Sequence, residues 1–191
     1  MSTDQGTAFG TWADPTSALM YRDAMPALLS GVQRDGHTLD LGGGNGLARA
    51  WFDRCTTVDT DPSKHPDVVA DALTYTPDEP VDRVLLRYVL HYLDNRQVRT
   101  LLRHVASYTT ELVVVQFVND DLRAKQANSV NEVKHFRTEP MVRALLHPWL
   151  VQRRVGVEYD VDPEFYANRL HHPNPVGHPE TVVGYLCRCR A

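Results

Sequence analysis

The stretch Leu39-Asp40-Leu41-Gly42-Gly43-Gly44-Asn45-Gly46 decides the fold of this 191-residue chain. Its alternate glycines directly follow a short apolar run that carries one acid, Asp40. Glycine lets a backbone turn sharply and pass close to a bound ligand. A second acid, Asp59, ends another apolar run 19 residues after Asp40, and an acid in that place suits the diol of a ribose. The spacing therefore predicts a site for a nucleoside-containing cofactor at the edge of a parallel sheet.

Short apolar runs alternate with helical patterns on both sides of this stretch. The expected strands are His37–Leu41, Thr56–Asp59, Asp67–Ala70, Arg83–Leu86 and Leu112–Val118. Helical patterns cover a segment from Thr16 or Ser17 to about Ser30, Gly46–Asp53 and Asn95–Tyr108. Continuously apolar runs such as Val113–Val115 are typical of strands that are covered on both faces. The alternation predicts an α/β sheet with right-handed crossovers.

The last third of the chain has a different pattern. A helix is expected after Thr138 as its N-cap, with Met141, Leu145 and Leu146 buried. Residues 151–158 then alternate with period two, and Thr181–Cys187 is a further strand candidate. The link between these strands holds four prolines and shows no crossover helix. We therefore expect an antiparallel pair at the end of the sheet.

Composition narrows the class of protein. The chain is 42% hydrophobic and 23% charged, as in a globular protein, and its length suits one domain over residues 1–191 with an N-terminal arm over 1–14. A net charge of −4 argues against a constitutive nucleic-acid binder. No window approaches the roughly 18 consecutive apolar residues of a membrane span. The first ten residues lack the regions of a signal peptide, so a cytoplasmic protein is expected.

We expect no metal site and no disulfide framework. Cys187 and Cys189 lie two apart in a strand-like run and point the same way as packing residues. His171, His172 and His178 lie on a proline-rich loop, where neighbouring histidines seldom converge on one ion without a well-placed acid.

The order of these motifs resembles the class I S-adenosylmethionine (SAM)-dependent methyltransferases over nearly the whole chain. The resemblance implies a Rossmann-like three-layer sandwich, with a seven-stranded, mostly parallel sheet and a terminal antiparallel strand. In that family the glycine loop lies beside the methionine part of SAM, and the acid that ends the second strand holds the ribose. An Asp-Ala pair after the third strand faces the adenine. The implied cofactor residues are Asp40, Gly42, Gly43, Gly44, Gly46, Asp59, Thr60, Asp71, Ala72 and Arg87.

The main rival for these glycines is a nicotinamide or flavin dinucleotide site. Its fingerprint requires Gly-x-Gly-x-x-Gly or Ala, and from Gly42 the last position is Leu47, which does not fit. A dinucleotide also places a pyrophosphate on a helix N-terminus. SAM brings a sulfonium cation, which acidic residues around the loop suit better.

Methyl transfer from a sulfonium is an in-line displacement in which proximity and orientation supply much of the rate. In an open α/β sheet, ligands lie beyond the carboxyl ends of the strands. His91 and Tyr88, after the fourth strand, are the candidate catalytic residues, and His91 is the candidate base. An alternative for His91 is a packing role beneath the cofactor. Candidate acceptor-binding residues are Tyr21, Tyr92, Asn119, Asp120 and His171.

The sequence thus predicts a SAM-dependent methyltransferase that acts on an O, N or C nucleophile of a small molecule and releases S-adenosylhomocysteine (SAH). We expect a monomer or homodimer with no membrane or nucleic-acid partner. Residues 119–138 are expected to be either a lid over the acceptor or a solvated helix. A non-catalytic SAM-fold binding protein is the alternative of a different class, and a dinucleotide oxidoreductase is a weaker one.

Overall fold

A single seven-stranded sheet organises the computed structural model, which describes residues 24–118, 135, 137–159 and 180–189. The strand order is β3-β2-β1-β4-β5-β7-β6. The strands are β1 (His37–Leu41), β2 (Arg54–Asp59), β3 (Val68–Val69), β4 (Arg83–Arg87), β5 (Glu111–Val118), β6 (Leu150–Tyr159) and β7 (Glu180–Arg188). All five expected parallel strands are therefore confirmed, with small differences at their ends.

The last two strands form the antiparallel pair that the proline-rich link predicted. β7 runs antiparallel to both of its neighbours and lies between β5 and β6. Its register with β5 is unbroken from Glu111↔Arg188 to Val118↔Thr181. β6 is consequently the edge strand, and the one strand of opposite direction lies inside the sheet.

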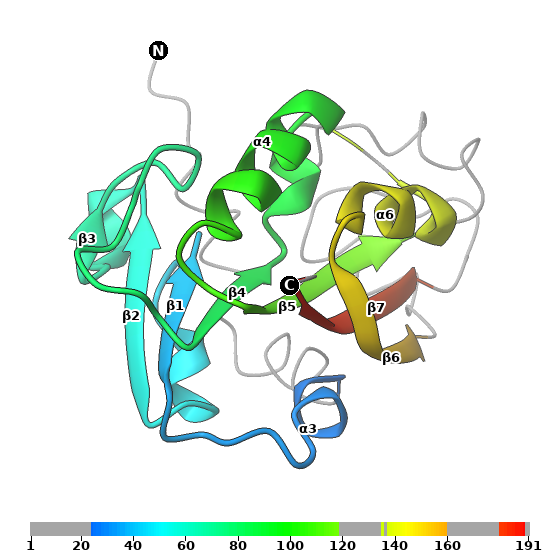
Figure 1. The fold of residues 1–191 in the computed structure, drawn as a ribbon, viewed down its shortest axis with the longest axis horizontal. Helices are drawn as coiled ribbons and strands as arrows, with labels where there is room; N and C mark the ends of the chain where they lie inside the picture. Colours follow the sequence, from blue (N-terminus) through cyan, green and yellow to red (C-terminus); the bar gives the residue numbers. More distant parts are fainter. Residues whose placement is uncertain (1–23, 119–134, 136, 160–179, 190–191) are drawn as a thin grey trace, which may run out of the picture.

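Helices cover both faces of the sheet. Figure 1 shows α4 (Asn95–Val105) and α6 (Glu139–Leu146) on one side and α3 (Ala24–Leu28) on the other. α4 begins with a capping box between Asp94 and Gln97, which fixes the start that the sequence predicted. None of the helices within the described ranges has the length and apolar character needed to cross a membrane.

α6 confirms one expectation and corrects another. The Thr138 hydroxyl accepts a hydrogen bond from the Met141 amide at 3.4 Å, so Thr138 is the N-cap. Met141 was expected to be buried, but it is 39% exposed. The buried face of α6 is centred on Val142, Leu145 and Leu146, and Met141 lies at the margin of that face.

The helical pattern over Gly46–Asp53 gives only one turn of 3-10 helix, η1 (Leu47–Ala50). Twelve residues separate β1 from β2, and the first five of them form the glycine loop. A parallel crossover normally needs about a dozen residues or more to return along the strands. Because the glycine loop uses the first five of these twelve residues, the remainder is too short to include an α-helix.

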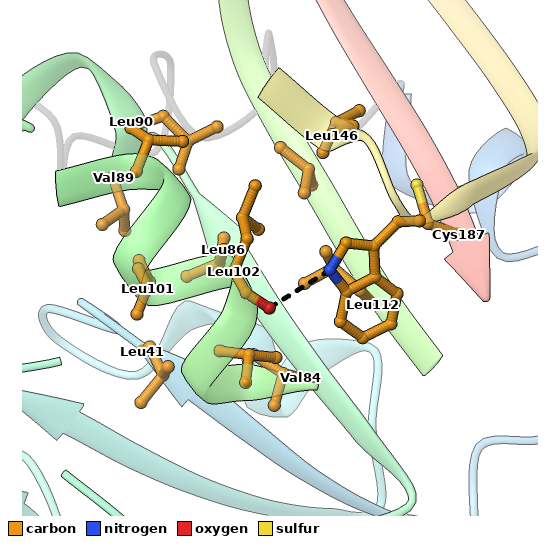
Figure 2. Packing of buried hydrophobic residues seen from close by; sticks show 14 of the residues in the cluster. Leu41, Val84, Leu86, Val89, Leu90, Leu101, Leu102, Leu112, Leu146 and Cys187 are labelled. Atoms are coloured by element: carbon orange, nitrogen blue, oxygen red, sulfur yellow. Dashed lines mark hydrogen bonds between the residues drawn. The ribbon is translucent and has the colours of Figure 1, made fainter. Parts of the chain in front are cut away.

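Alternation along the strands divides the core between the two faces. On the α4 side, Val84 and Leu86 of β4 pack with Leu101 and Leu102 of α4 and with Leu112. Figure 2 shows part of this cluster, including the hydrogen bond from the Trp149 indole nitrogen to the Leu102 carbonyl at 3.2 Å. On the α3 side the cluster contains Met25, Leu28, Phe52, Leu85, Val113, Val115 and Val182. Strands covered on both faces explain the continuously apolar runs in the sequence.

Cys187 is fully buried in the α4-side cluster, and the partly buried Cys189 packs against the same cluster. This confirms that the two side chains point the same way. Burial raises the pKa of the Cys187 thiol to about 12, so the thiolate is scarcely populated near neutral pH. The expected packing role fits both observations.

Candidate functional site

The glycine loop lies at the switch point of the sheet. β1 pairs with β2 on one side and with β4 on the other, so the connections diverge between β1 and β4. The crevice outside the carboxyl ends at such a point is where open α/β sheets bind ligands. The glycine loop follows β1, and Arg87 and Tyr88 follow β4. Two separate stretches of sequence therefore meet at one crevice.

Backbone hydrogen bonds fix the shape of the glycine loop. The amides of Gly42 and Gly43 both donate to the Val58 carbonyl of β2, at 2.7 and 3.1 Å. Gly42 has a φ of 73°, and a Cβ at this position would lie 2.6 Å from Val89 Cγ2. Gly44 has a φ of 52°, and a Cβ there would meet none of the described residues within 4 Å. The loop is thus packed against protein at Gly42 and open at Gly44.

Asp59 ties the second strand to this loop. Its Oδ2 accepts a hydrogen bond from the Gly44 amide at 2.9 Å, and its Oδ1 accepts one from the Asp61 amide at 2.9 Å. An ionised carboxylate offers about four lone-pair sites. Each oxygen therefore keeps one site, and a pair of adjacent hydroxyl groups matches that arrangement.

Asp40 is a fully buried acid beneath the loop. Neither carboxylate oxygen has a hydrogen-bond partner among the residues that the structure describes. Burial raises the pKa of Asp40 to about 6, with the positive charge of Arg87 opposing the shift and the negative charge of Asp59 adding to it. A Cβ on Gly43 would lie 2.8 Å from Asp40 Oδ2, so glycine is required for the loop to close over this carboxylate.

Arg87 approaches the same region from β4. Its guanidinium carbon lies 5.4 Å from the centre of the Trp51 ring. Its Nε is buried and has no acceptor within the described part of the chain. The adjacent strands β1 and β4 thus carry a carboxylate, Asp40, and a guanidinium, Arg87. Both carboxylate oxygens and the guanidinium Nε lack hydrogen-bond partners among the described residues.

The remaining expected cofactor residues, Thr60, Asp71 and Ala72, follow β2 and β3. Thr60 and Asp71 are exposed, and Ala72 packs against the α4-side cluster. The Asp71 carboxylate accepts a hydrogen bond from the Leu73 amide at 2.9 Å. Asp71 therefore shapes the turn after β3. The assignment of Asp71 and Ala72 to the adenine, and of Thr60 to the cofactor, stays a prediction.

Tyr88 and His91 lie on opposite sides of the sheet. Tyr88 has a φ of 57° directly after β4, and its ring packs against the α3-side cluster. Such a left-handed conformation is uncommon outside glycine and concentrates at functional sites. His91 belongs to η3 (Leu90–Tyr92), whose Leu90 is in the α4-side cluster. The structure does not bring the two candidate catalytic side chains together.

The His91 ring is almost fully buried at 4% exposure. Gln116 Nε2 lies 3.3 Å from His91 Nδ1, and an amide NH2 can only donate, so Nδ1 accepts. In the neutral ring the proton then lies on Nε2. Burial lowers the pKa of His91 to about 4. The Tyr92 ring lies beside it, with ring centres 4.1 Å apart and ring planes tilted by 44°.

Several expected residues lie outside the described part of the chain. These are Tyr21, Asn119, Asp120 and His171, the histidines considered for a metal, and most of the 119–138 stretch. Of that stretch, residues 135, 137 and 138 are described, and they are anchored by hydrogen bonds to neighbouring elements. Among the described residues, no group of three His, Cys, Asp or Glu side chains is placed to hold a metal ion.

Two side chains that the sequence did not single out lie next to the candidate site. Gln116 is the one polar residue within the apolar run of β5 from Leu112 to Val118, and that interruption was a usable signal. Arg137 is 3% exposed and donates to carbonyls around η3. Its partners Leu90 and Leu93 are more than 40 residues away in the sequence, so no local pattern could have revealed them.

Comparisons with known proteins show the fold. No family model matches this sequence, and no curated protein matches it. N-methyltransferase NodS from Bradyrhizobium japonicum WM9, solved with SAH, is similar with a TM-score of 0.65 at 16% identity, over 95% of this chain and 91% of that one. A putative methyltransferase from Bacillus halodurans C-125 gives 0.66 at 11% identity, over 91% and 98%.

A third similar structure is 1,6-didemethyltoxoflavin-N1-methyltransferase from Burkholderia thailandensis, which holds 1,6-didemethyltoxoflavin and SAH. Its TM-score is 0.62 at 16% identity, over 100% of this chain and 92% of that one. The chain thus has the Rossmann-like fold of class I SAM-dependent methyltransferases, as the order of its motifs implied.

Proposed function

We propose that this chain is a SAM-dependent methyltransferase that transfers a methyl group to an O, N or C nucleophile of a small molecule. One observation carries the proposal. A glycine loop, a buried acid and a diol-matching acid meet at the switch point of a sheet whose fold is that of class I methyltransferases.

The residues around the crevice fit SAM chemically. Asp40 is a buried carboxylate with unsatisfied oxygens, and Asp59 adds a second negative charge beside the same loop. Such a site favours a ligand with cationic groups, which SAM has at its sulfonium and its amine. The open side of Gly44 leaves room for a ligand against the loop backbone. In this proposal Asp59 holds the ribose, while Thr60, Asp71, Ala72 and Arg87 border the cofactor.

The same geometry disfavours a dinucleotide. A pyrophosphate is bound by the N-terminus of an α-helix, where free amides and the helix dipole favour an anion. Here the glycine loop leads into the four residues of η1, which provide little dipole. Two carboxylates beside the loop would also repel a pyrophosphate. Both Leu47, which does not fit the dinucleotide fingerprint, and the short 3-10 helix after the loop therefore argue against a dinucleotide.

SAM supplies a methyl group on a positively charged sulfur, which is already reactive toward a nucleophile. The protein therefore has to orient the two reactants and exclude water. Asp59 and the glycine loop would fix one end of the donor. The turn after β4, with Tyr88, His91 and Tyr92, would line the acceptor side in this proposal.

His91 is the candidate base, but its surroundings support the packing role better. A pKa of about 4 makes its imidazole a weak proton acceptor, and Gln116 already occupies the Nδ1 lone pair. Proton removal contributes most when the pKa of the base lies near the working pH. We therefore propose that orientation supplies most of the rate and that His91 stabilises the turn.

A small-molecule acceptor suits the extent of the fold. The match covers 91% of the NodS chain and 92% of the Burkholderia thailandensis enzyme, and the latter holds 1,6-didemethyltoxoflavin. A cytoplasmic monomer or homodimer that does not bind nucleic acid remains part of the proposal.

Calorimetric titration of the full chain with SAM, SAH and NAD⁺ tests the proposal. We expect SAM and SAH to bind with one site per chain and NAD⁺ not to bind. Absence of SAM binding would refute the proposal, and NAD⁺ binding in its place would favour the oxidoreductase. SAM binding with no methyl transfer across a panel of small amines, phenols and acids would favour the non-catalytic alternative.

A further inference from the structure

Arg137 is a buried cation that connects two separate parts of the chain. Its guanidinium donates to the Leu90 and Leu93 carbonyls, both at 2.6 Å, and to the His135 carbonyl at 3.4 Å. Its Nε donates to Asn95 Oδ1 at 3.0 Å. All but one of these acceptors lie between Leu90 and Asn95, from η3 to the start of α4. One side chain therefore holds the whole turn that follows β4.

The buried charge of Arg137 depends on these hydrogen bonds for its stability. Within the described ranges, no carboxylate forms an ion pair with Arg137, and burial lowers its pKa, with only the charge of Asp94 opposing the shift. Burying a charge without an ionised partner is unfavourable unless its hydrogen bonds are satisfied. A planar guanidinium can satisfy several carbonyls in a fixed geometry, which lysine cannot reproduce. Position 137 thus requires the planar donor geometry of arginine as well as its positive charge.

The turn that Arg137 holds contacts both sides of the candidate site. The His135 amide donates to the His91 carbonyl at 2.9 Å, next to the Arg137 bonds, and Gln116 contacts the His91 ring from β5. At the other end of the turn, Val89 packs against Gly42 of the glycine loop. A shift of the turn would therefore move the His91 and Tyr92 rings relative to the loop.

We propose that Arg137 is a positioning residue that fixes the turn Leu90–Tyr92, and with it the acceptor side of the site, against the glycine loop. The inference rests on the proposed function, because only that function makes this side of the site the acceptor side. Its structural part, the immobilisation of His91, can be measured in the free protein. The two parts can therefore fail separately.

The test uses the full chain with ¹³C at the Cε1 of its histidines, and His91→Asn identifies the His91 signal by NMR. In the wild-type chain we expect one narrow signal that titrates near the His91 pKa of about 4. In Arg137→Met the signal should broaden or divide. Its midpoint should move toward 6.5, the ordinary histidine value, because the turn opens to water and the guanidinium charge is lost.

Matched variants separate position from charge. Arg99→Met removes an exposed arginine of α4 and should leave the His91 signal unchanged. Arg137→Lys keeps the charge but not the planar donors, so its signal should be intermediate. If Arg137→Met does not fold, Arg137→Gln replaces it, because glutamine keeps a polar side chain. The His91 midpoint should shift in the same direction. An unchanged His91 signal in a folded Met or Gln variant overturns the proposal.

SAH titration of the same samples distinguishes the two proposals. SAH should shift the wild-type His91 signal, because the turn touches the glycine loop through Val89, and the shift should be smaller in Arg137→Met. If SAH binds and leaves the wild-type signal unmoved, the positioning role is overturned while the cofactor site stands. If SAH does not bind to the wild-type chain, the proposed function fails, and the Arg137 result in the free protein is unaffected.

Discussion

Asp59 Oδ2 accepts a hydrogen bond from the Gly44 amide at 2.9 Å, so the end of β2 holds the loop that follows β1. The carboxylate that we propose for the ribose is thus also a support for the glycine loop. Binding and loop shape depend on one residue. A substitution at Asp59 is therefore expected to affect affinity through both.

Asp59→Asn should weaken SAH binding. The amide has one acceptor oxygen and loses the charge, so it cannot serve Gly44, Asp61 and a diol at the same time. A hydrogen bond to a charged group contributes about 1.5–3 kcal/mol, which predicts roughly a 10- to 100-fold higher Kd in calorimetry. Asp61→Asn is the control, because the carboxylate of this half-buried acid caps η2 through the Ser63 amide. Equal affinities for wild type and Asp59→Asn would place the ribose elsewhere.

Asp40→Asn should stabilise the free protein at neutral pH. A carboxyl with a raised folded pKa contributes its full stability below its unfolded pKa of 3.8 and loses it as pH rises through about 6. The loss amounts to about 3 kcal/mol for a shift of this size. In urea titrations, the free energy of unfolding of the variant should therefore rise relative to that of the wild type by up to this amount between pH 4 and 7. The same variant should bind SAM more weakly, since the buried charge is removed.

His91→Asn should show the opposite dependence on pH. A histidine with a lowered folded pKa contributes its stability above its unfolded pKa of 6.5 and loses it as pH falls through about 4. The wild type should thus lose about 3 kcal/mol over that window, and the variant should not. Urea titrations at pH 7, 5.5 and 4 measure the difference. Parallel curves for the two proteins would mean that His91 titrates as an exposed side chain.

Gly42→Ala and Gly44→Ala form a matched pair. Both residues have a left-handed backbone, which costs about 1–2 kcal/mol for a residue with a Cβ. Gly42→Ala also places a methyl 2.6 Å from Val89 Cγ2, and overpacking adds about 1–3 kcal/mol. Thermal unfolding should rank Gly42→Ala as the less stable. Gly44→Ala should instead lose SAH affinity beyond its small stability loss, because its methyl enters the open side of the loop.

Sequence patterns predicted what depends on local spacing. The five parallel strands, the start of α4, the N-cap at Thr138 and the antiparallel end of the sheet follow from apolar runs, capping residues and prolines. The length of η1 did not follow, because it depends on how much of a short connection the glycine loop uses. Arg137 and Gln116 act on η3 across distant parts of the chain. Their roles appear only when the strands are in place.

The separation of Tyr88 and His91 has a similar cause. The two residues are three apart, and a helical turn would place them on one face. The left-handed backbone of Tyr88 instead redirects the chain directly after β4. A local pattern cannot predict that reversal, because tyrosine seldom adopts this conformation.

The position of β7 sets the order in which the sheet can be completed during synthesis. β6 hydrogen-bonds only to β7 among the described strands, so residues 150–159 have no place in the sheet until residues 180–188 have been made. Until then β5 presents an unpaired, strongly apolar edge to other chains, and such edges promote aggregation. We therefore expect aggregation through the β5 edge to compete with folding until β7 has been made.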